Sequence, residues 1–194
     1  MRLVTIILLL VLGSYACNNS SKGRRVIVVQ PLGQFSATEA KTIVAPISAL
    51  GAEVVLRDNR SIPQSFYYWP RNRYRADSLI RFLKTKVGKD SIIVGILNED
   101  ISTTKDDVAD WGVMGLGYRP GNSCVVSSFR INKKKRAEQL YKVVLHELGH
   151  TEGLDHCPEK TCLMRDAEGG NPLDEEKGFC AQCKAQLKRK GWGL

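Results

Sequence analysis

The only three histidines of this 194-residue chain lie within one eleven-residue segment that has the pattern HExxHxxGxxH. His146 and His150 are four residues apart, so on a helix their imidazoles share one face and can reach the same metal ion. Glu147 lies beside that face, where its carboxylate can polarise a water molecule on the metal. Gly153 tolerates the positive φ that ends a helix abruptly, and this exit can bring His156 back as a third ligand.

Three protein nitrogens on zinc leave one tetrahedral position for water, which distinguishes a catalytic zinc site from a structural one. The alternative is that the histidines are ordinary core or surface groups, since two histidines at helical spacing around a glutamate also occur by chance. Three histidines in register with a helix-ending glycine form a longer and much more specific motif. We therefore predict a catalytic zinc ion bound by His146, His150 and His156.

Four of the six cysteines follow this motif in two close pairs, Cys-x4-Cys and Cys-x2-Cys. Four thiolates in two pairs can form a closed tetrahedral zinc site, which is structural because it has no open position. The pairs could instead be disulfides, or the second pair could be a redox-active dithiol. Zinc is favoured because both pairs adjoin a catalytic zinc motif. The predicted ligands are Cys157, Cys162, Cys180 and Cys183.

The segment HELGHTEGLDHCPEKTCLM, followed by FCAQC, resembles the signature of the archaemetzincin family of zinc peptidases. The segments NRYRADSLI and VGILNEDIS extend the resemblance over most of the chain. It implies that the three histidines hold the catalytic zinc, that Glu147 is the general acid/base and that the four cysteines hold a second zinc. It also implies that Met164 is the methionine of the Met-turn, a tight turn beneath the catalytic metal.

The first residues of the chain predict export. Residues 1–16 combine Arg2, an apolar run too short to span a bilayer and small residues before a cleavage site, as a signal peptide does. A cysteine directly after Ala16 indicates a bacterial lipoprotein of the cell envelope that is lipidated on Cys17, with residues 17–24 as a flexible tether. The alternative is ordinary secretion with cleavage of the same bond.

The formal net charge of +9 raises the question of a nucleic-acid partner. The basic runs 133–136 and 188–190 have no interleaved aromatic residues and belong to no nucleic-acid motif. Solvated faces with some attraction to anionic head groups explain them better. We expect a peptide or protein substrate and a membrane contact through the lipid, but no nucleic acid.

The order of elements predicts an α/β fold with a mixed or mostly parallel sheet and helices packed on it. Residues 25–194 are expected to form one catalytic domain, with an N-terminal subdomain over 25–153 and a C-terminal subdomain over 154–194. Ser36 and Glu39 form a capping box, and Asn72 is expected to cap a second helix that includes Tyr74. The expected strands are 25–30, 53–57 and 91–97, and the expected helices are 37–50, 72–83 and a helix from about 134 through the first two histidines.

Residues 113–118 and 123–131 read as two further strands joined by a turn. The resemblance implies that the first of them faces the cleft and pairs with an extended substrate through the backbone of Gly115, Leu116 and Gly117. The alternative is that these glycines only permit tight packing or a bulge. Both interpretations stay open on the sequence alone.

The function that these residues predict is zinc-dependent hydrolysis of peptide bonds. The competing class is an exported, non-catalytic zinc-binding module with the same histidines. Zinc binding needs only the imidazoles, so the presence of Glu147 favours the peptidase. The sequence leaves endopeptidase and aminopeptidase activity both open.

Overall fold

The computed structural model of this protein describes residues 26–194. The expected signal peptide, the lipidation site Cys17 and the tether lie outside the described residues. Within residues 26–194, no helix is both long enough and apolar enough to cross a lipid bilayer. The division into two subdomains at residue 153 stays a prediction.

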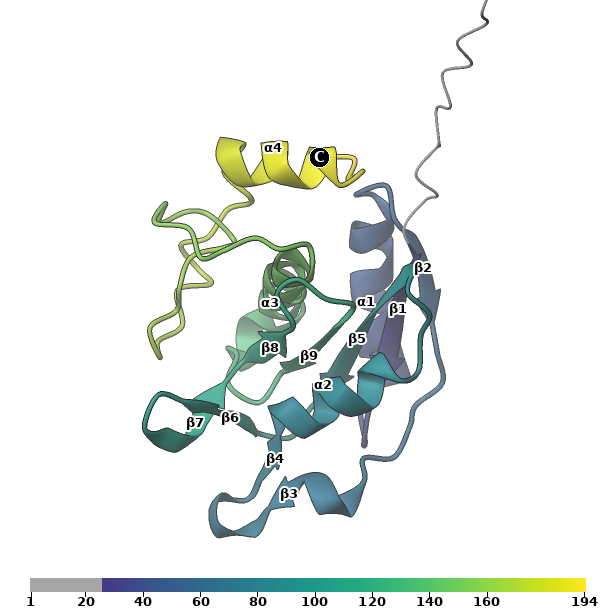
Figure 1. Ribbon diagram of the computed structural model, residues 1–194, viewed down its shortest axis with the longest axis vertical. Helices are drawn as coiled ribbons and strands as arrows, with labels where there is room; N and C mark the ends of the chain where they lie inside the picture. The colour runs from purple at the N-terminus through teal and green to yellow at the C-terminus, as the bar shows by residue number, and fades with distance from the viewer. Residues whose placement is uncertain (1–25) are drawn as a thin grey trace, which may run out of the picture.

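The centre of the protein is a five-stranded sheet with the strand order β2-β1-β5-β9-β8 (Figure 1). The first four strands in this order run parallel to their neighbours, and β8 is antiparallel to β9. The predicted mixed, mostly parallel sheet is therefore confirmed, with the apolar strand β5 at its centre. The strands are β1 (Val26–Pro31), β2 (Glu53–Leu56), β5 (Ser91–Leu97), β8 (Gly115–Gly117) and β9 (Ser123–Ser127).

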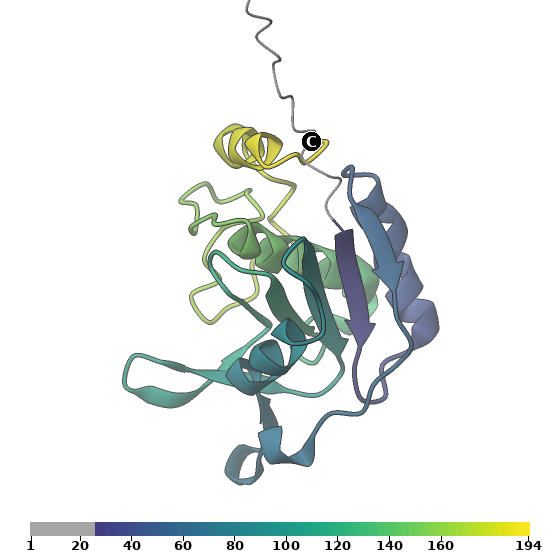
Figure 2. The same ribbon diagram turned by 45° about the vertical axis from the view of Figure 1, so that its right-hand side comes forward.

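Helices cover both faces of this sheet, because alternate side chains of a strand point to opposite faces. Ile92 and Val94 of β5 belong to a core shared with α1 and α3, whereas Ile93 and Leu97 belong to a core shared with α2. Figures 1 and 2 show α2 on one side of the sheet and α1 with α3 on the other. The helices are α1 (Ala37–Ser48), α2 (Ala76–Lys84), α3 (Arg136–Thr151) and α4 (Ala181–Arg189).

The predicted start of α1 is confirmed, whereas the predicted start of α2 is wrong. Ser36 is the N-cap of α1, and its side chain accepts a hydrogen bond from the Glu39 N–H at 3.3 Å, as a capping box requires. The prediction that Asn72 caps α2 is wrong: Asn72 has a φ of 50° at the end of a 3-10 turn. Tyr74 lies in β4, paired with Ile101, because strand pairing outweighs the local helical pattern.

A second sheet, with the strand order β3-β4-β6-β7, is absent from the sequence-based prediction. Its strands are short and largely polar, so they lack the alternating pattern by which a strand is recognised. Strands β6 and β7 form a hairpin that extends away from the main sheet (Figures 1 and 2). The elements of this region are η1 (Gln64–Phe66), β3 (Tyr67–Tyr68), η2 (Trp69–Arg71), β4 (Arg73–Arg75), β6 (Ile101–Lys105) and β7 (Val108–Val113).

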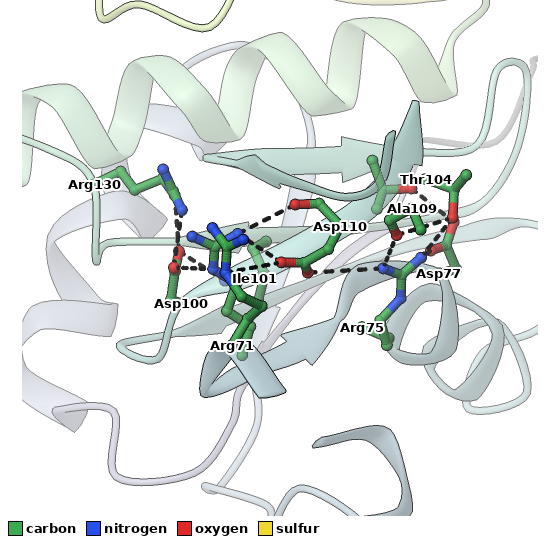
Figure 3. Close-up of polar contacts among 11 residues, drawn as sticks. Arg71, Arg75, Asp77, Asp100, Ile101, Thr104, Ala109, Asp110 and Arg130 are labelled. Atoms are coloured by element: carbon green, nitrogen blue, oxygen red, sulfur yellow. Dashed lines mark hydrogen bonds and ion pairs between the residues drawn. The ribbon is translucent and has the colours of Figure 1, made fainter. Parts of the chain in front are cut away.

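Ion pairs fix the β6–β7 hairpin to the rest of the fold (Figure 3). Asp100 accepts from the Nε and NH2 groups of Arg130, at 2.7 and 2.8 Å. Its other neighbour is Arg73, whose Nε lies 2.7 Å from Oδ2. Arg73 also pairs with Asp110 of β7 at 3.0 Å, and Arg75 donates to the Ala109 carbonyl at 2.6 Å. Because largely buried charges must be paired, this arrangement holds the hairpin in one position.

Candidate active site

Helix α3 carries the first two histidines and the glutamate of the motif. It is preceded by a 3-10 turn, η3 (Lys133–Lys135), in which the Asn132 side chain accepts from the Lys134 N–H at 2.9 Å. The expected cap at Asn132 is thus present, one turn before the α-helix proper. Leu140, Val144 and Leu148 are fully buried against the sheet, as expected, whereas Ala137 is exposed.

The end of α3 brings the third histidine to the other two. Gly153 has a φ of 93°, as expected, and its N–H donates to the His150 carbonyl at 2.8 Å. The Leu154 N–H donates to the Gly149 carbonyl at 3.0 Å, so the chain reverses within three residues of the helix end. One nitrogen each of His146, His150 and His156 lies within 4.8 Å of the others.

The second nitrogen of each imidazole has its own acceptor. Nδ1 of His146 lies 2.6 Å from the Leu163 carbonyl oxygen, and Nδ1 of His150 lies 2.8 Å from that of Leu154. Nδ1 of His156 lies 3.3 Å from Oδ2 of Asp166. Such acceptors fix the tautomer and leave Nε2 of each ring free to bind a metal. The sequence did not reveal them, because backbone carbonyls have no sequence signature and Asp166 lies outside the motif.

Burial sets the protonation of the site. Burial, and to a lesser extent the neighbouring His150, lower the pKa of His146 to about 3. The hydrogen bond to the Leu163 carbonyl acts in the opposite direction but does not outweigh burial, so this imidazole is neutral. Neutral imidazoles are the form that ligates metals. Burial also raises the pKa of Glu147, which is 5% exposed, to about 8. A carboxyl group in this range is suited to exchanging a proton near neutral pH.

Met164 lies directly beneath the helix of the ligands. It lies within a turn that is closed by a hydrogen bond of 3.0 Å from the Arg165 N–H to the Cys162 carbonyl, and it is fully buried. A Cβ added to Gly149 would be 2.4 Å from the Met164 sulfur. The absence of a side chain at Gly149 therefore allows Met164 to pack against α3 between the two histidines.

The four cysteines of the two pairs also meet. Their sulfur atoms lie within 4.8 Å of one another, and those of Cys157 and Cys180 are 3.7 Å apart. All are free thiols, and a disulfide would require a separation of about 2.05 Å. Four thiolates at about 2.3 Å from one zinc ion would be about 3.8 Å apart, which fits the observed spacing. Cys124 lies outside this cluster and is fully buried in the core, as expected.

Burial and backbone hydrogen bonds act in opposite directions on the thiols of the cysteine cluster, and burial raises the pKa of Cys162 and of Cys183. The N–H groups of Cys180 and Met164 donate to the sulfur of Cys162 at 3.3 and 3.5 Å. Burial alone would raise the pKa of the Cys180 thiol, but donors including the Cys183 N–H lower it to about 7. Donation to sulfur stabilises the deprotonated form that binds zinc.

The histidines open into a cavity of about 780 Å³ between two walls. One wall consists of the β6–β7 hairpin with β8, and the other of residues 165–173 with Glu176. The walls come close to each other at Gly169, where an added Cβ would be 3.0 Å from the ring of Trp111. Such a concave site next to a set of metal ligands is where a substrate is expected to bind.

Strand β8 is the edge of the main sheet and lines this cavity. A Cβ on Gly115 would be 2.4 Å from Oε1 of Glu147, and one on Gly117 would be 3.1 Å from the Glu147 carbonyl oxygen. The tight packing considered for these glycines is therefore present. Pairing of a substrate with Gly115, Leu116 and Gly117 stays a prediction.

The fold and the site indicate a class of protein: a mixed sheet covered by helices, with three converging imidazoles and a buried glutamate that line one cavity, has the features of a zinc-dependent peptidase. Residues 37–189 match the family model described as Peptidase family M54. The chain belongs to this family, the archaemetzincins, and is a zinc metallopeptidase.

Individual relatives cover most of the chain. The archaemetzincin of Haloquadratum walsbyi is 28% identical over 176 residues, which are 84% of this chain and 99% of that protein. The archaemetzincin of Methanopyrus kandleri is 30% identical over 144 residues, which are 72% of this chain and 80% of that protein. The crystal structure of Methanopyrus kandleri archaemetzincin has a TM-score of 0.73 at 26% identity and covers 88% of this chain and 96% of that one.

The contact between Gly115 and Glu147 gives a direct test of the site. Gly115→Ala should displace the Glu147 carboxylate and lower kcat/KM for peptide hydrolysis by about 10²-fold, while zinc content stays the same. The matched control is Gly88→Ala, since a Cβ there meets nothing within 4 Å. Full activity of the Gly115 variant would show that the close packing has no bearing on catalysis.

Proposed function

We propose that this protein hydrolyses peptide bonds with Glu147 as general acid/base, beside a zinc ion held by His146, His150 and His156. The single observation that carries the proposal is the position of Glu147. Its carboxylate is buried and lines the same cavity as the three converging imidazoles. A site that only stored zinc would have no use for an acid placed in this way.

The residues present fit zinc at both centres. The three imidazoles converge with their Nδ1 atoms held by acceptors, which is the donor set of a catalytic zinc, and the four thiols have the number and spacing of a structural zinc. When bound by the histidines, zinc would supply Lewis acidity that lowers the pKa of water and polarises a carbonyl group. The proposed cofactors are therefore two zinc ions.

Glu147 performs the proton transfers in this mechanism. Its carboxylate accepts a proton from the water that attacks the scissile carbonyl carbon, and the resulting carboxylic acid delivers this proton to the amine that leaves. Burial by β8 keeps the carboxyl group away from bulk water and holds it in one place. Burial raises the pKa of Glu147 to about 8, so near neutral pH the group readily takes up the proton that the water releases.

The edge strand β8 would hold the substrate. The backbone of Gly115, Leu116 and Gly117 lies along the cavity on the free side of the sheet, where an extended peptide could add as a further strand. Since Gly115 and Gly117 also adjoin Glu147, a peptide in this position would have its backbone next to the general base.

The competing function is a zinc-binding module without catalysis, which would use the same histidines. Glu147→Gln separates the two: zinc binding should persist, while peptide hydrolysis should fall by about 10²- to 10⁴-fold because the proton acceptor is lost. Zinc content by atomic emission and cleavage of a peptide library, with and without chelator, provide the measurements. Glu138→Gln, an exposed acid on the same helix, is the matched control and should retain activity. If neither wild type nor control shows chelator-sensitive cleavage, the zinc-binding module is the better account.

Metal analysis tests the proposed number of ions. Wild type should contain two zinc ions per chain, and His150→Ala and Cys162→Ser should each contain one, because each removes a ligand from a different centre. Cys124→Ala should keep two, since this cysteine lies outside the cluster. If wild type contains one zinc ion and its cysteines are oxidised, the second zinc site is contradicted and the cysteines form disulfides instead.

We also propose export and anchoring through a lipid on Cys17, on the strength of the sequence of residues 1–24. The exposed basic residues of the C-terminal region support a location at an anionic surface, because residues 177–194 contain no acidic residue. Helix α4 lies at the end of the domain where β1 begins (Figures 1 and 2).

Fractionation of the expressing bacterium tests the anchor. Wild type should be found with the membranes and should incorporate labelled fatty acid, whereas Cys17→Ser should do neither, because it has no thiol to acylate. Cys124→Ser, a thiol change within the core, is the control and should remain with the membranes. Membrane association of the Cys17 variant without label would contradict anchoring by a lipid.

A further inference from the structure

Glu176 is a buried carboxylate that the proposed mechanism does not use. It is 3% exposed and lines the same cavity as Glu147 and the histidines. Its Oε2 atom is fully buried and has no hydrogen-bond partner among residues 26–194. Because a buried polar atom without a partner is costly, it points to a partner that comes from outside the chain.

The two cations whose charges act on Glu176, Lys142 and Arg165, are engaged elsewhere. Lys142 of α3 pairs with Glu138 at 2.6 Å and donates to the Leu173 carbonyl at 2.7 Å. Arg165 pairs with Glu175 at 2.6 Å. Neither cation forms an ion pair with Glu176, so the fold places an acid here without a matching base.

The balance of charges around Glu176 is unfavourable for an isolated carboxylate. Burial raises the pKa of Glu176 to about 7, and this outweighs the opposing fields of Lys142 and Arg165; Glu175 acts in the same direction as burial. A cation brought to this carboxylate would offset the cost of burying its charge.

Part of the cavity lining is apolar. Val143 of α3 and Leu173 are 4% and 3% exposed, and Pro172 is buried. The Leu173 carbonyl is bound to Lys142, so this segment lies against the turn of α3 that contains Val143. An apolar lining with an acid beside it matches a long aliphatic stem with a cationic head.

We propose that Glu176 forms the acidic end of a side-chain subsite in the active-site cavity, which takes a lysine or arginine side chain of the peptide substrate. The inference rests on the proposed peptidase function and adds the class of side chain that the cleft selects. Arginine can donate two parallel hydrogen bonds to a carboxylate, which would give Oε2 its partner. Glu176 then determines specificity and takes no part in the proton transfers of Glu147.

Peptide pairs that differ only in charge test this subsite. Each pair consists of two fluorogenic peptides that are identical except at one position. One peptide has arginine there and the other has citrulline, which has nearly the same shape without the charge, and the pairs sample each position of the peptide in turn. At one position, the zinc-loaded wild type should have a kcat/KM at least about tenfold higher for arginine, equivalent to about 1.4 kcal/mol. In Glu176→Gln this ratio should fall to about one, and because it is a ratio, a general loss of activity cancels.

Two further variants test whether the preference for arginine depends on the carboxylate of Glu176. Glu168→Gln removes an exposed acid that lines the same cavity and should keep the ratio of wild type. Glu176→Asp keeps the charge and should retain part of the ratio, which preserves the test if the glutamine variant does not fold. A wild-type ratio near one at every position, or a ratio that survives in Glu176→Gln, overturns the inference.

Binding without turnover separates this inference from the proposed function. The Glu147→Gln variant should bind the arginine peptide about tenfold more tightly than the citrulline peptide in fluorescence anisotropy, and the double variant with Glu176→Gln should not. Selective binding with no hydrolysis in wild type would overturn the proposed catalysis and support the subsite. Hydrolysis in wild type with no selectivity for charge would support the proposed catalysis and overturn the subsite.

Discussion

The close approach of α3 to its neighbours on two sides is the constraint on which the site depends. On the side of β8, a Cβ on Gly115 would overlap the Glu147 carboxylate, and on the other side a Cβ on Gly149 would overlap the Met164 sulfur. Two glycines thus set the depth at which the helix lies. This depth buries His146 and Glu147, which is why the pKa of His146 is lowered and that of Glu147 is raised.

The chain after α3 has little regular secondary structure, and the two proposed zinc centres would stabilise it instead. Between Thr151 and Ala181 there is no helix or strand, only turns and an isolated bridge between Cys162 and Gly178. In the proposed structural zinc site, the four cysteines would hold this segment together. Because Leu163 in the same segment accepts from His146, the cysteine cluster supports the orientation of a catalytic ligand.

Charge pairing shapes the walls of the cleft. Arg130 and Arg165 both line the cavity, but each is paired with an acid, Asp100 and Glu175. The pairs of Asp100 also hold the base of the β6–β7 hairpin, so the same contacts that fix this wall remove positive charge from the cavity (Figure 3). Glu176 is left as a buried acid without such a pair, which gives the opposite wall its chemical character.

The sequence by itself determined the parts that depend on local spacing. Helical periodicity and a glycine place three histidines and Glu147 at one helix end, β-branched runs specify the parallel strands, and the pairs of cysteines specify a cluster, because each of these signals lies within a few residues. Only the tertiary structure decided the polar second sheet, the start of α2 after Asn72, the acceptors of the imidazoles and the isolation of Glu176. These features arise from contacts between residues far apart in the chain, where strand pairing, backbone carbonyls and burial have no local pattern in the sequence.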